Sequence, residues 1–149
     1  MKNKKTLPAY FDSSVLVKIY VRERGSARGR QLVRTRQVVT SSITGLELMS
    51  AFRRNLASGS IDEKAHSAIV SRFRRHREKF RYVELTPMVF ENAERCGSDF
   101  DVRALDAIHI ASAAVSRERF PKDLPFVTAD SRQREVATQL GLQVIWLDE

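Results

Sequence analysis

The chain has few of the residues that stabilise secreted or membrane-bound proteins. Its 149 residues include one cysteine, Cys96, and no apolar run that approaches the length of a membrane-spanning helix. A single thiol cannot form an intramolecular disulfide, and no second cysteine or histidine stands near it at the spacing of a metal site. We therefore expect a cytoplasmic protein without a membrane segment, stabilised by its core instead of by cross-links.

Acidic residues are also in short supply. The chain has 18 Asp and Glu residues against 26 Lys and Arg residues, a formal net charge of +8. Most of the cations are arginines, which favour phosphate because a guanidinium group can donate two parallel hydrogen bonds. The excess charge thus indicates a nucleic-acid partner, although a basic surface can also serve solubility alone. With 42% hydrophobic residues the composition is that of a globular protein, and the length fits one domain over residues 1–149.

Short apolar runs alternate with amphipathic stretches. Such alternation predicts strands joined by helical crossovers, and hence a parallel sheet with helices on both faces. In such sheets ligands bind at the carboxyl ends of the strands, where the strand order reverses. Asp12 and Asp130 each follow a strand candidate. The predicted strands span residues 7–11, 38–41, 82–85, 125–128 and 143–147. Helices with a predicted start and end span about residues 14–20, 44–57, 61–79, 87–96 and 102–117.

Three acidic residues have an alternative role as helix caps. Asp12 precedes a helix, so its carboxylate could accept a backbone N–H. Glu47 fits a capping box with Thr44, and Asp130 could cap the last helix with Gln133 in the reciprocal position. Taken singly, none of the three therefore indicates catalysis.

Asp106 is different, because we place it one turn inside the most apolar predicted helix. Leu105 and Ala107 flank it. A carboxylate taken out of water needs a cation, a proton or hydrogen-bond donors, since burying it unpaired costs several kcal/mol. His109 lies three residues further on and could be a metal ligand. A packed or carboxylate-supporting histidine is the alternative, since hard divalent ions prefer oxygen.

Four segments place the acidic residues in similar surroundings along the chain. They are Tyr-Phe-Asp-Ser-Ser-Val-Leu-Val-Lys (10–18), Ser-Ile-Thr-Gly-Leu-Glu-Leu (42–48), Leu-Asp-Ala-Ile-His-Ile-Ala (105–111) and Phe-Val-Thr-Ala-Asp (126–130). In this order they resemble the successive motifs of PIN-domain nucleases, and most closely those of the VapC-type toxins of toxin–antitoxin pairs. The resemblance covers essentially the whole chain and implies a three-layer α/β/α sandwich with a five-stranded parallel sheet of order 3-2-1-4-5 and a two-helix arm.

The resemblance also implies a reaction, the hydrolysis of RNA phosphodiester bonds with Mg²⁺ or Mn²⁺. Four catalytic acids are implied, of which the three aspartates bind metal and the glutamate orients or deprotonates the attacking water. Residues 131–134 contain no further acid, which leaves a second metal site in doubt. The acids are Asp12, Glu47, Asp106 and Asp130, and the hydroxyls expected to hold these carboxylates are those of Ser13, Ser14 and Thr128.

Partners follow from the same resemblance. We expect a homodimer, inhibited by an antitoxin whose C-terminal segment lies between the first helices and the two-helix arm. The apolar positions expected to receive it are Ile19, Tyr20, Leu48 and Phe52. The arginines expected to bind RNA on the arm are Arg53, Arg54, Arg72, Arg74, Arg75 and Arg77.

Three other functions compete with a toxin. A phosphotransfer enzyme with an aspartyl nucleophile at Asp12 is disfavoured, because Ser14 stands where such enzymes commonly have a second acid. A non-catalytic RNA-binding or scaffold domain would be expected to have lost one of the four acids, and none is lost. A housekeeping RNA-processing nuclease remains open. An antitoxin-like reading frame immediately upstream would distinguish a toxin from it.

Overall fold

The computed structural model describes residues 6–120 and 124–147 of the chain. Its centre is a sheet of five parallel strands in the order β3-β2-β1-β4-β5. This order confirms the predicted sheet, and it puts the reversal of strand order between β1 and β4. The strands are β1 (Pro8–Phe11), β2 (Gln37–Ser41), β3 (Arg81–Val83), β4 (Phe126–Thr128) and β5 (Val144–Trp146).

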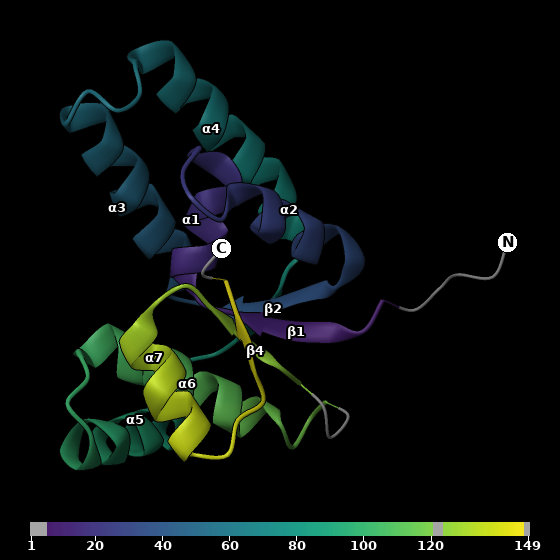
Figure 1. The fold of residues 1–149 in the computed structure, drawn as a ribbon, viewed down its shortest axis with the longest axis vertical. Coiled ribbons are helices and arrows are strands. Elements are labelled where there is room, and N and C mark those ends of the chain that lie inside the picture. The colour runs from purple at the N-terminus through teal and green to yellow at the C-terminus, as the bar shows by residue number, and fades with distance from the viewer. Residues whose placement is uncertain (1–5, 121–123, 148–149) are drawn as a thin grey trace, which may run out of the picture.

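Helices cover both faces of the sheet, which confirms the three-layer sandwich (Figure 1). On one face, α3 and α4 extend away from the sheet as the predicted two-helix arm, and the short η1 (Arg77–Lys79) joins α4 to β3. The helices of this face are α1 (Ser13–Tyr20), α2 (Ser26–Thr35), α3 (Thr44–Ala57) and α4 (Glu63–His76). Those of the other face are α5 (Pro87–Asp99), α6 (Ala104–Ser116) and α7 (Ser131–Gln139).

Each face of the sheet has its own core, because successive side chains of a strand point to opposite faces. Phe11 packs with Leu16 and Phe52 beneath α1 and α3. Its neighbour Tyr10 points to the other face, where it packs with Ile110 of α6. Burying an apolar side chain of this size stabilises the fold by about 1.5–3 kcal/mol, so a slip of β1 by one residue would be costly. The register of β1 is therefore fixed where the chain reaches residue 12.

Two predicted helix faces are wrong in detail. In the sequence, Leu46, Met49, Phe52 and Leu56 recur at helical spacing and predict one buried stripe on α3. Leu46 is instead 69% exposed, because Thr44 and Gly45 pack inward at the start of the helix. In α6 the alanines at 104, 107, 111 and 114 predict a row that packs against the sheet. Ala107 and Ala111 are buried, but Ala104 is exposed, and Leu105 of the neighbouring apolar row is turned outward. The helix also begins at Ala104, two residues later than predicted, so residue 106 lies in its first turn and not one turn inside.

None of the helices formed by the described residues is long and apolar enough to cross a membrane.

Candidate active site

Asp12 lies at the carboxyl end of β1, where the strand order reverses, and is fully buried. Its Oδ1 accepts hydrogen bonds from the Ser14 hydroxyl at 2.7 Å and from the backbone N–H of Val15 at 3.2 Å. Its Oδ2 accepts from the Thr128 hydroxyl at 2.8 Å. Burial raises the pKa of the Asp12 carboxyl, and neither His109 nor these hydrogen bonds offset the rise. Asp12 is thus both the N-cap of α1 and a buried acid.

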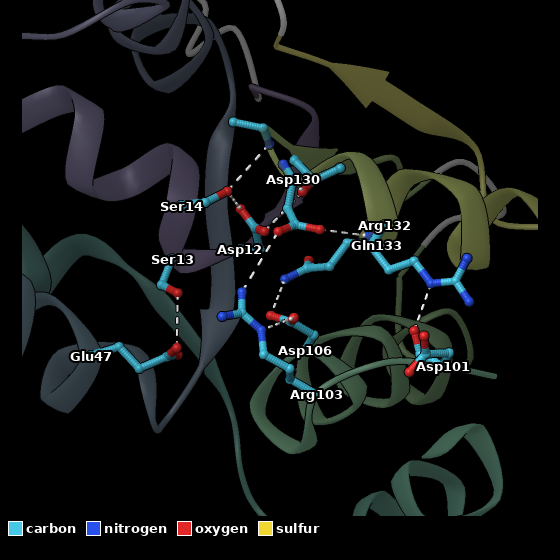
Figure 2. Close-up of polar contacts among 12 residues, drawn as sticks. Asp12, Ser13, Ser14, Glu47, Asp101, Arg103, Asp106, Asp130, Arg132 and Gln133 are labelled. Atoms are coloured by element: carbon cyan, nitrogen blue, oxygen red, sulfur yellow. Dashed lines mark hydrogen bonds and ion pairs between the residues drawn. The ribbon is translucent and has the colours of Figure 1, made fainter. Parts of the chain in front are cut away.

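Asp130 and Asp106 are joined through one glutamine. Asp130 follows β4 and caps α7, because its Oδ1 accepts from the Gln133 N–H at 2.8 Å. The side-chain amide of Gln133 donates to Asp106 Oδ1 at 2.7 Å (Figure 2). Thr128, which donates to Asp12, accepts from the backbone N–H of Asp130 at 3.0 Å. The three aspartates therefore belong to one hydrogen-bonded cluster.

Arg103 closes this cluster on the solvent side. Its Nε lies 3.3 Å from Asp106 Oδ2, and a terminal nitrogen lies 3.9 Å from Asp130 Oδ2. The Arg103 side chain is 84% exposed, so the ion pairs are well solvated. Exposed pairs of this kind contribute about 0–1 kcal/mol, and a cation of higher charge could displace the guanidinium.

Glu47 makes contacts of its own, and Figure 2 shows its carboxylate joined to Ser13, the residue that follows Asp12. Its Oε2 accepts from the Ser13 hydroxyl at 3.0 Å, and its Oε1 lies 2.5 Å from Nε2 of His109. The Glu47 side chain is 19% exposed, whereas His109 is fully buried. Glu47 is thus the more exposed partner of a contact whose other partner, His109, lies in the core.

Neither capping box considered as an alternative role of Glu47 or Asp130 forms completely. The N-cap residue of α3 is Ile43, which offers no side-chain hydrogen bond, and the Thr44 hydroxyl pairs with that of Thr40 at 2.7 Å. Glu47 consequently turns away from the helix end, towards the residues described above. In the second box only the cap half exists, because Gln133 reaches a different carboxylate. The tertiary contacts of these side chains therefore replace the local ones.

Three residues of the site were not assigned from the sequence. Arg103 stands three residues before Asp106, a spacing that places two side chains on one helix face and could have indicated the pair. Gln133 was considered only as part of a cap. Tyr10, whose hydroxyl lies 2.8 Å from Nδ1 of His109, gave no signal, because strand alternation does not tell which helix covers which face.

The residues present fit a hard divalent cation in their chemistry. Asp12, Asp106, Asp130 and Gln133 offer only oxygen ligands, and among the described residues Oε1 of Gln133 is buried without a hydrogen-bond partner. Within residues 6–120 and 124–147, however, no three His, Cys, Asp or Glu side chains are arranged to hold a metal ion together. A cation bound here would therefore need water, or a small movement of these side chains, to complete its ligands.

The arm presents the six arginines in two different settings. Arg72 donates to the carbonyl oxygens of Ile19 and Tyr20 at 3.4 and 3.5 Å and lies 5.2 Å from the centre of the Tyr20 ring. Arg77 lies over the Phe73 ring at 5.3 Å. These two are held by the fold, whereas the side chains exposed to solvent are those of Arg53, Arg54, Arg74 and Arg75.

The four apolar positions expected to receive an antitoxin are not exposed. Ile19, Tyr20, Leu48 and Phe52 are at most 9% exposed, because they form the core between α1, α3 and α4. Only the edges of the first two reach a groove of about 900 Å³ between α1, α2 and α4. Its lining is apolar at Ile19, Tyr20, Val33, Val38 and Phe80 and basic at Arg22, Arg30, Arg34, Arg36, Arg72 and Lys79.

Comparisons with known proteins agree with this architecture. The family model of the PIN domain matches residues 9–139. Ribonuclease VapC46 of Mycobacterium tuberculosis is 34% identical over 138 residues, which cover 91% of this chain and 95% of that protein.

Solved structures resemble the fold at low sequence identity. FitAcB from Neisseria gonorrhoeae has a TM-score of 0.67 at 16% identity, covering 92% of this chain and 96% of that one. VapBC2 from Rickettsia felis, bound to a DNA fragment from their promoter, has a TM-score of 0.64 at 11% identity, covering 95% of this chain and 100% of that one.

Proposed function

The chain belongs to the PIN-domain family, and on this premise we propose that it is a metal-dependent ribonuclease and the toxin of a toxin–antitoxin pair. The relative that it matches over most of its length is a ribonuclease. Two of the solved structures that share its fold, from Rickettsia felis and from Mycobacterium tuberculosis, are VapBC proteins, the latter described as a toxin–antitoxin system.

One observation carries the catalytic part of the proposal. Three aspartates from three separated segments meet in one hydrogen-bonded cluster at the reversal of strand order. One of the three, Asp12, is fully buried. Enclosing like charges in this way is costly for folding alone, so the cluster is better explained by a cation that it binds.

In the proposed site Asp12, Asp106 and Asp130 hold the cation, Mg²⁺ or Mn²⁺, directly or through water. When bound, the ion would lower the pKa of a water molecule that it binds and would offset the negative charge that develops on the phosphate. Glu47 accepts the proton of the attacking water. Ser13 holds the Glu47 carboxylate in place.

Ser14 and Thr128 each donate to a different oxygen of Asp12, and these hydrogen bonds hold the carboxylate in one orientation. The exposed arginines of the arm, Arg53, Arg54, Arg74 and Arg75, bind RNA phosphates. Each neutralised phosphate contributes about 0.7 to the slope of log affinity against log salt for a single strand.

Single-turnover RNA cleavage tests the catalytic proposal. We expect Glu47→Gln and Asp130→Asn to lose at least a hundredfold in rate, as is typical when a proton acceptor or a charge-stabilising group is removed. Glu94→Gln, a charge change at an exposed position of α5, is the matched control and should cleave normally. Wild-type protein should be inactive in chelator and recover with Mg²⁺ or Mn²⁺. Cleavage that survives both carboxylate changes would contradict the proposal.

The antitoxin is proposed to occupy the groove between α1, α2 and α4. A groove lined by both apolar and basic side chains fits an amphipathic segment that carries acidic side chains. Expressed from its native locus, the chain should co-purify with the product of the neighbouring reading frame. Arg30→Glu with Arg34→Glu should abolish this, whereas Arg95→Glu on α5 should not. If the neighbouring product is recovered equally with wild type, with the Arg30/Arg34 double variant and with Arg95→Glu, the antitoxin does not bind in this groove.

The proposed homodimer is tested separately, by light scattering over a range of concentrations. A monomer at micromolar concentration would contradict it.

A further inference from the structure

A buried chain of polar groups leads from β1 to Glu47. The Tyr10 hydroxyl lies 2.8 Å from Nδ1 of His109, and Nε2 of His109 lies 2.5 Å from Glu47 Oε1. Tyr10 and His109 are both fully buried. This series of hydrogen-bonded side chains therefore ends at Glu47, the one carboxylate of the site that the aspartate cluster does not hold.

The hydrogens of this chain can be assigned from its chemistry. A phenol carries its hydrogen at neutral pH, because its ordinary pKa is about 10. It can then donate to Nδ1 of neutral His109, which leaves the ring hydrogen on Nε2. If the ring is charged, Nε2 carries a hydrogen as well. In both forms Nε2–H donates to Glu47, which as a carboxylate can only accept.

Packing holds the Tyr10 and His109 rings rigidly in place. The Tyr10 ring stacks on Phe126 of β4 with centroids 5.6 Å apart and planes 15° apart, and it meets the His109 ring edge-on at 6.0 Å. Tyr10 lies in the core on this face of the sheet, and the His109 ring of α6 is fully buried. The direction of Nε2–H is therefore fixed by packing before any substrate binds.

Two helices on opposite faces of the sheet thus hold the Glu47 carboxylate. His109 comes from α6 on one face, and Ser13 comes from α1 on the other. Each occupies one carboxylate oxygen, and each oxygen keeps a further lone pair. A glutamate side chain has three rotatable bonds, so without these donors the carboxylate would be free to turn away or to cap its own helix.

We propose that Tyr10 and His109 are positioning residues that fix the Glu47 carboxylate in the orientation from which it accepts a proton from the attacking water. The inference rests on the proposed function, because it concerns how the proton acceptor of that site is held. His109 does not serve as a metal ligand in this arrangement, since both of its ring nitrogens are engaged.

Three variants test this positioning of Glu47 by Tyr10 and His109, which we call the relay. Tyr10→Phe removes the hydroxyl and keeps the ring. His109→Leu removes both ring contacts, and His109→Gln keeps an N–H donor near the position of Nε2. Each is measured for single-turnover rate, KM for a defined RNA, thermal melting with and without Mn²⁺, and the ¹⁵N shifts of His109 where it is present.

We expect rate losses with little change in KM or in the Mn²⁺-induced rise of Tm. Tyr10→Phe should lose about tenfold and His109→Leu about a hundredfold, within the range of a general base. His109→Gln should regain about tenfold of the latter loss. The ¹⁵N shifts of wild type should show a hydrogen on Nε2. A hydrogen on Nδ1 alone, or folded His109→Leu protein with wild-type rate, would overturn the relay.

A structural role is separated by combining changes with Glu47→Gln. If the relay acts only through Glu47, adding His109→Leu to that variant should cause no further loss of rate. A full additional hundredfold loss would mean that His109 acts elsewhere. Wild-type activity of Glu47→Gln would instead refute the proposed role of Glu47. An inactive Glu47→Gln beside an active His109→Leu would refute the relay alone.

Discussion

Replacing Asp106 separates its role in catalysis from its role in folding. Its carboxylate accepts from the Gln133 amide at 2.7 Å and pairs with exposed Arg103 at 3.3 Å. Asp106→Asn keeps an oxygen for the amide and loses only the exposed ion pair, a cost of about 0–1 kcal/mol. It also relieves repulsion among the aspartates. We therefore expect the metal-free Asn variant to be as stable as wild type within about 1 kcal/mol.

Asp106→Ala should behave differently, because it also removes the acceptor of a buried amide. Gln133 is 3% exposed and its Oε1 already lacks a partner among the described residues. Leaving Nε2 unpaired as well costs about 1–3 kcal/mol. For a chain of this size that corresponds to a fall in Tm of roughly 2–12 °C relative to the Asn variant.

Melting curves in chelator and in Mn²⁺, with an RNA cleavage assay on the same preparations, measure both effects. Both variants should fail to cleave, and their Mn²⁺-induced rise in Tm should shrink, since stabilisation by a ligand follows its affinity for the folded state. Glu94→Gln controls for the change of charge. An Asn variant that cleaves at the wild-type rate would refute the active site. Equal stability of the Asn and Ala variants would refute the account of Gln133.

Three further changes have defined outcomes. Because burial raises the pKa of Asp12, the folded state binds its proton more tightly than the unfolded state, and the contribution of Asp12 to wild-type stability falls as pH rises from about 3.9 to the raised pKa. In urea unfolding with chelator, the stability of Asp12→Asn relative to wild type should therefore increase across that pH window and then level off. A difference that does not change with pH would contradict this account. Arg103→Gln should tighten Mn²⁺ binding by up to about fivefold in calorimetry, the equivalent of 1 kcal/mol, whereas weaker binding would mean that Arg103 does not compete with the ion. Arg72→Ala should lower the free energy of unfolding by about 1–2 kcal/mol, whereas exposed Arg74→Ala should change it by less than about 0.5 kcal/mol and reduce the salt slope of RNA binding by about 0.7; the reverse pattern would refute their assignment.

The fold could be predicted because its signals are periodic and local. Apolar runs that end at Asp12 and Asp130 indicate buried parallel strands, and the helices between them force crossover connections. The strand order came from the family resemblance and not from the pattern itself. The exposure of Leu46 and Leu105 was missed because a helical period fixes which residues share a face, but not how the helix is rotated against the sheet.

The site shows the same division between local and tertiary information. The cap assigned to Asp12 is real, yet it did not exclude a second role, since one carboxylate has enough lone pairs for a backbone N–H and two hydroxyls. For Glu47 the local cap lost to partners 34 and 62 residues away, because a hydroxyl and a buried ring N–H offer the carboxylate better enclosed donors than a helix end open to water. Sequence spacing records only near neighbours. The contacts that determine what Glu47 can do were therefore visible only once the two helix layers were placed on one sheet.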